Sequence, residues 1–197
     1  MRYGRPLPPV IVRFLATLFL AILSLASQAL AAPFVVFPKV RELESPGRAL
    51  VLFEQESEAA SRGAFHTLWL KVAATGESRK FYDYIGAAAV AWQDDDRLLI
   101  TEYLSRRTSR ALLLSVSHPT ESIMIDVPAV IRGVPPELRD TLRQNDHVFV
   151  EALRVEAGTF HLRVWGYGQH DPQGFRWHCE YGLTEARFSC SEEQGAR

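Results

Sequence analysis

Phe160-His-Leu-Arg-Val-Trp165 is the stretch of sequence that decides the fold class of this chain. Side chains of an extended strand point alternately to its two faces, and here the alternation separates apolar from mostly polar residues. Phe160, Leu162 and Val164 share one face, whereas His161, Arg163 and Trp165 share the other. A period of two in residues of high β propensity predicts a strand of an antiparallel sheet that is buried on one face.

The same kind of strand recurs outward from this stretch. Residues 122–127 also alternate, whereas residues 98–104 begin as a continuous apolar run. Three segments, 48–84, 97–127 and 147–190, each read as strand, loop, strand, turn and strand. Their inner strand pairs are 49–53 with 67–72, 98–103 with 111–117, and 148–153 with 160–165. We therefore predict an all-β fold, an antiparallel meander of three blade-like units arranged as a partial propeller or a sandwich.

One segment departs from the β pattern, Val134-Pro-Pro-Glu-Leu-Arg-Asp-Thr-Leu-Arg143. Pro136 is tolerated in a first helical turn, and Leu138 and Leu142 lie four residues apart on one helical face. We expect one short helix near 135–143 that joins the second and third units. No linker divides the chain after residue 31, so residues 32–197 are predicted to form a single domain.

The N-terminal 31 residues have the layout of a secretory signal peptide. Three arginines precede the apolar run 14–25, and Ala29 and Ala31 occupy the two small positions of a cleavage site. We predict cleavage after Ala31, which leaves an exported domain, periplasmic or secreted, without a membrane span. The alternative is an uncleaved segment that anchors the protein in the inner membrane, because residues 14–32 are uncharged over 19 positions.

The net charge indicates which partners to expect. The whole chain carries a net charge of −1 at pH 7, and the predicted signal peptide contains three arginines and no acid. The remaining chain therefore has a net charge of −4, which gives no general attraction to nucleic acid or to anionic lipid. We expect another envelope protein or a cell-wall component as the partner.

Both cysteines lie in the predicted exported domain, at Cys179 and Cys190. An even pair in an oxidising compartment is typical of a disulfide, here one that bridges two strands of a hairpin. This register also pairs Tyr181 with Phe188 and Leu183 with Ala186, which leaves Thr184-Glu185 as a two-residue turn.

Val90-Ala-Trp-Gln-Asp-Asp-Asp-Arg-Leu-Leu-Ile100 resembles one repeat of the TolB-type β-propellers. Those repeats run apolar-x-Trp-Ser-Pro-Asp-Gly-Arg/Lys-x-Leu-apolar, and Trp92, Asp95, Arg97 and Leu99 stand in register with them. Asp94 and Asp96 take the places of the proline and the glycine. The resemblance implies a strand that ends in a packed aromatic residue, a tight polar turn, four-stranded blades and, by analogy, an interaction role at the envelope.

The richest group of functional side chains follows the opening stretch, in residues 165–181. Three glycines and a proline shape a long loop between two strands. The loop could bind a ligand, or its polar residues could be structural, because histidine and aspartate favour turns. The spacing matches no established metal motif, so we predict neither a metal nor another cofactor. The candidate ligand-binding residues of this segment are Trp165, Tyr167, His170, Asp171 and His178.

A second candidate is the basic stretch Ser105-Arg-Arg-Thr-Ser-Arg110 between two apolar strands. Arg106, Arg107 and Arg110 could together grip a carboxylate or a phosphate, or they could form a solvated hairpin tip. The run Asp94-Asp-Asp96 lacks the spacing of an EF-hand calcium loop, and we expect a turn there.

Motifs of nucleophilic catalysis are absent from the sequence. Ser115, Ser117 and His118 lie close together, but no acid is evident to orient the histidine. We therefore predict an exported binding or assembly module. The alternative is a small envelope hydrolase or metal-dependent enzyme that uses His170, Asp171 and His178, which requires their side chains to converge within about 3–4 Å of a common point.

Overall fold

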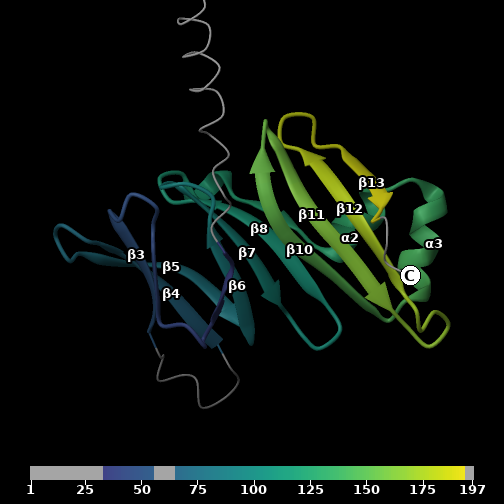
Figure 1. Cartoon of the computed structure of the whole chain (residues 1–197), viewed down its shortest axis with the longest axis horizontal. Helices are drawn as coiled ribbons and strands as arrows, with labels where there is room; N and C mark the ends of the chain where they lie inside the picture. The colour runs from purple at the N-terminus through teal and green to yellow at the C-terminus, as the bar shows by residue number, and fades with distance from the viewer. Residues whose placement is uncertain (1–32, 56–64, 194–197) are drawn as a thin grey trace, which may run out of the picture. The chain divides into compact units, whose positions relative to one another are not determined.

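The computed structural model describes residues 33–55 and 65–193 (Figure 1). The predicted signal peptide, residues 1–31, lies outside this range. Among the described residues, no helix has both the length and the apolar character needed to cross a membrane.

The described residues form three antiparallel sheets (Figure 1). Strands adjacent in sequence are neighbours in each sheet, except that β1 (Val35–Phe37) pairs with β6 (Ala87–Trp92), and the four strands between them form the first sheet. The first sheet holds β2 (Glu42–Glu44), β3 (Leu50–Gln55), β4 (Phe65–Val72) and β5 (Ser78–Ile85). The central sheet holds β1 (Val35–Phe37), β6 (Ala87–Trp92), β7 (Arg97–Tyr103), β8 (Ser109–Ser115) and β9 (Ile123–Ile125). The third sheet holds β10 (His147–Glu156), β11 (Thr159–Tyr167), β12 (Phe175–Gly182) and β13 (Phe188–Glu192). The predicted all-β meander is confirmed, and each predicted inner strand pair forms.

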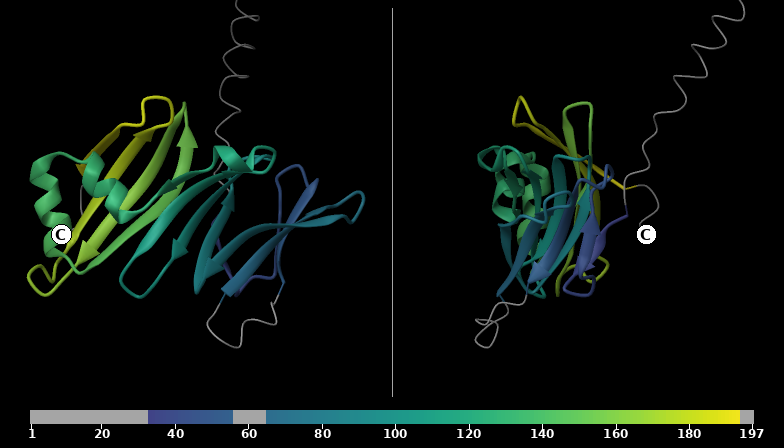
Figure 2. Two further views of the ribbon diagram at one scale, coloured as in Figure 1. Left: turned by 180° about the vertical axis from the view of Figure 1, so that it is seen from behind. Right: turned by 90° about the vertical axis from the view of Figure 1, so that its left-hand side faces the viewer.

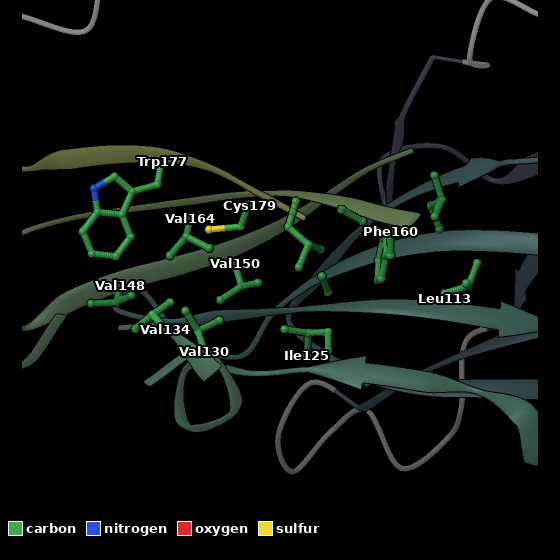
Figure 3. Close-up of a cluster of buried hydrophobic side chains, with 14 of the residues drawn as sticks. Leu113, Ile125, Val130, Val134, Val148, Val150, Phe160, Val164, Trp177 and Cys179 are labelled. Carbon is green, nitrogen blue, oxygen red and sulfur yellow. The ribbon is translucent and has the colours of Figure 1, made fainter. Parts of the chain in front are cut away.

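The central sheet is buried on both faces, which explains why its strands are continuous apolar runs. One face forms a first hydrophobic core with the first sheet, in which Ile100 packs in the same cluster as Leu52 and Leu68. The other face forms a second core with the third sheet, in which Leu113 joins Val150 and Phe160 (Figure 3). Burial of these apolar side chains is the dominant favourable contribution to folding.

The predicted helix near 135–143 is confirmed as α3 (Pro136–Gln144), and its Leu142 is buried. The expectation of a single helix is wrong, because α2 (Val127–Gly133) precedes it and a short 3-10 turn spans Pro119–Glu121. Asp126 caps α2 by accepting a hydrogen bond from the Ala129 backbone N–H at 2.8 Å, so the strand predicted over 122–127 ends early. Both helices cover one face of the third sheet (Figure 2) and close the second core there.

The disulfide-bonded hairpin is confirmed. Cys179 and Cys190 are bonded and lie directly opposite one another on β12 and β13, with their Cα atoms 4.1 Å apart. The predicted turn is wrong. The Leu183 N–H donates to the carbonyl of Gly158, and the Ala186 N–H donates to the carbonyl of Gly182. The turn therefore spans residues 183–186, because Leu183 packs against the second core instead of pairing across the hairpin.

Candidate functional site

The side chains of the third sheet that point away from the second core form a continuous surface, which we call the outer face. Its order follows from the pairing of β11 with β12. On β11 and β12, His161 lies opposite Glu180, Arg163 opposite His178, and Trp165 opposite Arg176. On the other side of β11, the β10 residues Glu151 and Phe149 lie opposite Arg163 and Trp165. Residues two apart along a strand are about 6.8 Å apart, so the outer face carries three distinct groups of side chains in succession.

The first group is an aromatic row made of His147, Phe149, Trp165 and Tyr167. Phe149 stacks on Trp165 with ring centroids 4.3 Å apart, and His147 stacks on Tyr167 at 4.5 Å. Both are direct cross-strand pairs, and such pairs stabilise a two-strand ribbon. Trp165 and Tyr167 follow one another along β11 with centroids 6.3 Å apart. The row is therefore rigid, and Tyr167 at its end is 41% exposed.

A hollow of about 400 Å³ lies beside Trp165 and Tyr167. Its other wall is the turn before β12, with Gln173, Gly174 and Arg176 among the lining residues. Asp171 shapes this turn, because its carboxylate accepts a hydrogen bond from the Gly174 N–H at 3.0 Å. The volume lies at the lower end of the range of small-ligand pockets, roughly 300–1,000 Å³.

Gly174 controls the shape of this hollow, and replacing it with alanine is expected to destabilise the fold by about 2 kcal/mol. Its φ is +69°, and an added Cβ would lie 2.1 Å from the carbonyl oxygen of Gly166. Gly158 is a matched control, because its φ is +78° but a Cβ there meets nothing within 4 Å. Gly158→Ala should cost only about 1 kcal/mol in urea unfolding. Equal costs for the two variants would contradict the close approach at Gly174.

The second group is a row of ion pairs in the middle of the outer face. Arg163 lies 3.5 Å from a carboxylate oxygen of Glu151 and 3.1 Å from one of Glu193. Arg176 approaches the same Glu193 at 3.8 Å. Partly exposed pairs of this kind contribute little to stability, but they hold the two guanidinium groups in place beside the aromatic row.

The third group is a cluster of His161, His178 and Glu180. Nδ1 of His161 lies 3.1 Å from Nε2 of His178, and the Glu180 carboxylate oxygen lies 3.7 Å and 3.8 Å from these two nitrogens. Burial is the main cause that lowers the pKa of His161, and the Arg154 guanidinium acts in the same direction, whereas Glu180 opposes the shift. The two facing ring nitrogens of His161 and His178 form a hydrogen bond, and the tautomers decide which of them donates.

The residues predicted for the loop are separated into different groups. Trp165 and Tyr167 line the hollow, whereas His170 is exposed and the Asp171 carboxylate is bound to its own turn. His178 does face a histidine and an acid, but these are His161 and Glu180. Within residues 33–55 and 65–193, this is the one set of three metal-binding side chains whose donor atoms lie within 4.8 Å of one another. His170, Asp171 and His178 do not form such a set.

The three arginines of the predicted basic tip do not form a joint site. Arg106 and Arg107 are exposed in the β7–β8 turn. Arg110 lies on β8 instead, where its guanidinium binds the buried Glu102 carboxylate at 2.7 Å. Arg110 is therefore a structural residue, and its guanidinium is already engaged.

The acidic run Asp94-Asp-Asp96 forms a turn, as predicted, and its carboxylates diverge. Asp94 accepts from the Arg97 N–H at 2.8 Å, and Asp95 accepts from the Gly47 N–H at 2.6 Å. Asp96 accepts from the Ser115 hydroxyl at 2.9 Å. An acid therefore lies near the serines where the sequence suggested none. The Asp96 carboxylate accepts hydrogen bonds from the Ser115 hydroxyl and the Ser117 backbone N–H, and His118 contacts the Ser117 hydroxyl. In a catalytic triad the acid would instead bind the histidine, so these residues do not form one.

Comparison with known proteins gives no relative: no family model, no curated protein and no solved structure matches this chain. The resemblance of residues 90–100 to a TolB-type repeat therefore stays a prediction. Its local geometry is present, since β6 ends in the buried Trp92 and a turn of polar residues leads into Arg97 on β7. The Trp92 indole N–H donates to the carbonyl of Leu43 at 3.3 Å.

Proposed function

We propose that this protein is an exported binding module that docks a segment of another extracytoplasmic protein on its outer face. The observation that carries the proposal is the aromatic row, which stands directly beside the hollow of about 400 Å³. An inserted side chain of the partner fits a space of this size next to Trp165 and Tyr167. The guanidinium of Arg176 at the rim suits a carboxylate or a backbone carbonyl of the same segment.

The composition of this surface supports a protein partner. Tryptophan, tyrosine and arginine are the residue types that most often dominate binding energy at protein interfaces. Trp165 is held by its stack on Phe149, which is only 6% exposed, so little side-chain entropy is lost when the partner binds. Arg163 and Arg176 with their acidic partners supply the polar rim that surrounds such an interface core.

The export that this proposal includes rests on two observations. Residues 1–31 have the layout of a signal peptide, and the Cys179–Cys190 disulfide is the bond expected of an oxidising compartment. The competing hydrolase proposal has no comparable support, because the Asp171 carboxylate is occupied in its own turn and His170 is exposed.

Photocrosslinking in the living cell tests the proposal. A benzoyl-phenylalanine in place of Tyr167 should give a discrete adduct whose added mass glycosidases do not remove. The same group in place of Met124, which is similarly exposed on β9 of the central sheet, should give none. The additional substitution Trp165→Ala should lower the adduct yield at position 167 at least about tenfold, because it removes the centre of the interface.

Three outcomes would contradict a protein partner. These are equal adducts at positions 167 and 124, no adduct at position 167, and an adduct that glycosidases return to the mass of the protein alone. The last outcome would indicate a cell-wall polysaccharide instead. Thermal unfolding of the Trp165→Ala variant provides the control that a lower yield reflects lost contact and not a lost fold.

A further inference from the structure

We propose that His161, His178 and Glu180 form a binding site for a divalent first-row transition metal ion, with Zn²⁺ as the best-suited ion. The three donor atoms come from two neighbouring strands and lie within 4.8 Å of one another. Two imidazole nitrogens with one carboxylate oxygen are a donor set that zinc enzymes use. This site lies on the outer face but does not depend on the aromatic row, and it goes beyond the proposed protein binding.

The donor spacing fits a tetrahedral ion. With bonds of about 2.0–2.1 Å, two donors of a tetrahedral zinc site lie roughly 3.3 Å apart. The distances here are 3.1 Å between the His161 and His178 nitrogens, and 3.7 Å and 3.8 Å from these nitrogens to the Glu180 oxygen. Shifts of a few tenths of an ångström in side-chain position bring all three to that value.

The backbone that presents these donors is fixed. His161 and Glu180 are directly opposite on β11 and β12, and His178 precedes Glu180 by two residues on the same strand face. Cys179, between the two β12 donors, points into the core and is bonded to Cys190 on β13. The disulfide therefore holds the strand segment that carries two of the three donors, which is the support that a preorganised metal site requires.

The chemistry of the set selects the class of ion. Calcium and magnesium prefer all-oxygen sites, whereas imidazole nitrogens favour zinc, copper, nickel and iron. The neighbouring cation Arg154 is itself paired with Glu156 at 3.0 Å, which reduces its repulsion of a bound ion. Three protein donors leave a fourth position for water or for a side chain of a partner.

Titration of the full chain with Zn²⁺ by isothermal calorimetry tests the site, using protein without a histidine tag. We expect saturable binding of one ion per chain. His178→Gln and Glu180→Gln should each weaken binding at least about tenfold, because each removes one of three donors. His170→Gln, which removes an exposed histidine of the loop between β11 and β12, outside the cluster, is the matched control and should bind normally.

Two further readouts separate a metal site from a merely structural cluster. Zn²⁺ should raise the thermal unfolding midpoint of the unmodified chain and of His170→Gln, but not that of the two donor variants. Bound Co²⁺ should show the intense visible bands of a four-coordinate ion.

The proposal is overturned if the chain binds no Zn²⁺ saturably, or if His178→Gln and Glu180→Gln bind it as tightly as the control. Both donor residues are accessible, so these variants are expected to fold, and their unfolding midpoints in chelator verify this.

Discussion

Replacing Arg110 with methionine is expected to reduce the free energy of unfolding by about 3 kcal/mol. The reason is Glu102, whose carboxylate is 1% exposed in the middle of the central sheet. Arg110 Nε and a second guanidinium nitrogen both lie 2.7 Å from the same carboxylate oxygen. Removing the guanidinium leaves a buried charge without its counter-ion. Arg110 is itself 27% exposed, which places the expected cost at the low end of the range for buried pairs.

The remaining hydrogen bonds to Glu102 do not replace the lost charge. The Tyr82 hydroxyl donates to the Glu102 carboxylate at 2.6 Å, and the Ile85 N–H donates at 3.1 Å. Burial, reinforced by Glu102, raises the pKa of Tyr82 well above its usual range, so this hydroxyl keeps its proton and remains a neutral donor. Both donors can orient the carboxylate, but neither neutralises it.

Urea unfolding monitored by circular dichroism measures this effect. Arg107→Met is the matched control, because Arg107 is exposed in the adjacent turn, and it should change stability by no more than about 0.5 kcal/mol. The double variant Glu102→Gln with Arg110→Met should recover part of the loss, since it removes the unpaired charge. A loss below about 1 kcal/mol for Arg110→Met, or no recovery in the double variant, would contradict the structural role assigned to the pair.

Arg110 also shows where sequence analysis fails. The sequence groups it with Arg106 and Arg107 in one basic stretch, but it lies on β8 directly opposite Glu102 on β7. A lone glutamate in the apolar segment 98–104 was the available signal for a buried ion pair. The register of the two strands decides the pairing, and the number of residues in the turn between them was not known from the sequence.

The fold itself was largely predictable, because alternation and continuous apolar runs depend on burial alone. The opening stretch lies in β11 with its apolar residues in the second core, as its period of two predicts. Helix α2 was missed because its Val127, Val130 and Ile131 are β-branched and extend an alternating stretch. The capping residue Asp126 and the proline after Val127 were the signals for a helix start.

The candidate site was only partly predictable. The concentration of polar and aromatic residues in 165–181 points to Trp165 and Tyr167, which line the hollow, and to His178, which lies beside His161 and Glu180. Alternation places His161 on the strand face opposite Phe160 and Leu162, but its pairing with Glu180 depends on the register of β11 with β12. That register is set by the loop between them, in which Asp171 binds Gly174. No periodicity in the sequence encodes such a turn.

Loss of the disulfide is expected to reduce the free energy of unfolding about as much as Arg110→Met does. Replacing Cys190 with alanine should destabilise the fold by about 3 kcal/mol, because the bond closes a loop with a sequence separation of 11 and restricts the unfolded chain. Cys190 is the better choice for the test, since the buried Cys179 can remain in the core as a small apolar thiol. Ser191→Ala, at the adjacent exposed position, is the control and should change stability by about 0.5 kcal/mol or less.

Reduction of the unmodified chain provides an independent measure of the same bond. Urea unfolding in dithiothreitol should lower its stability to that of Cys190→Ala, while the variant itself should be insensitive to the reductant. Mass spectrometry should show the oxidised chain two hydrogens lighter than the dithiol form.

The hairpin of β12 and β13 should stay paired in the reduced chain. Tyr181 on β12 packs on Phe188 on β13 with ring centroids 4.9 Å apart, and this contact does not depend on the disulfide. Two thiols that react with an alkylating agent without reductant, or equal stability with and without dithiothreitol, would contradict this role of the bond.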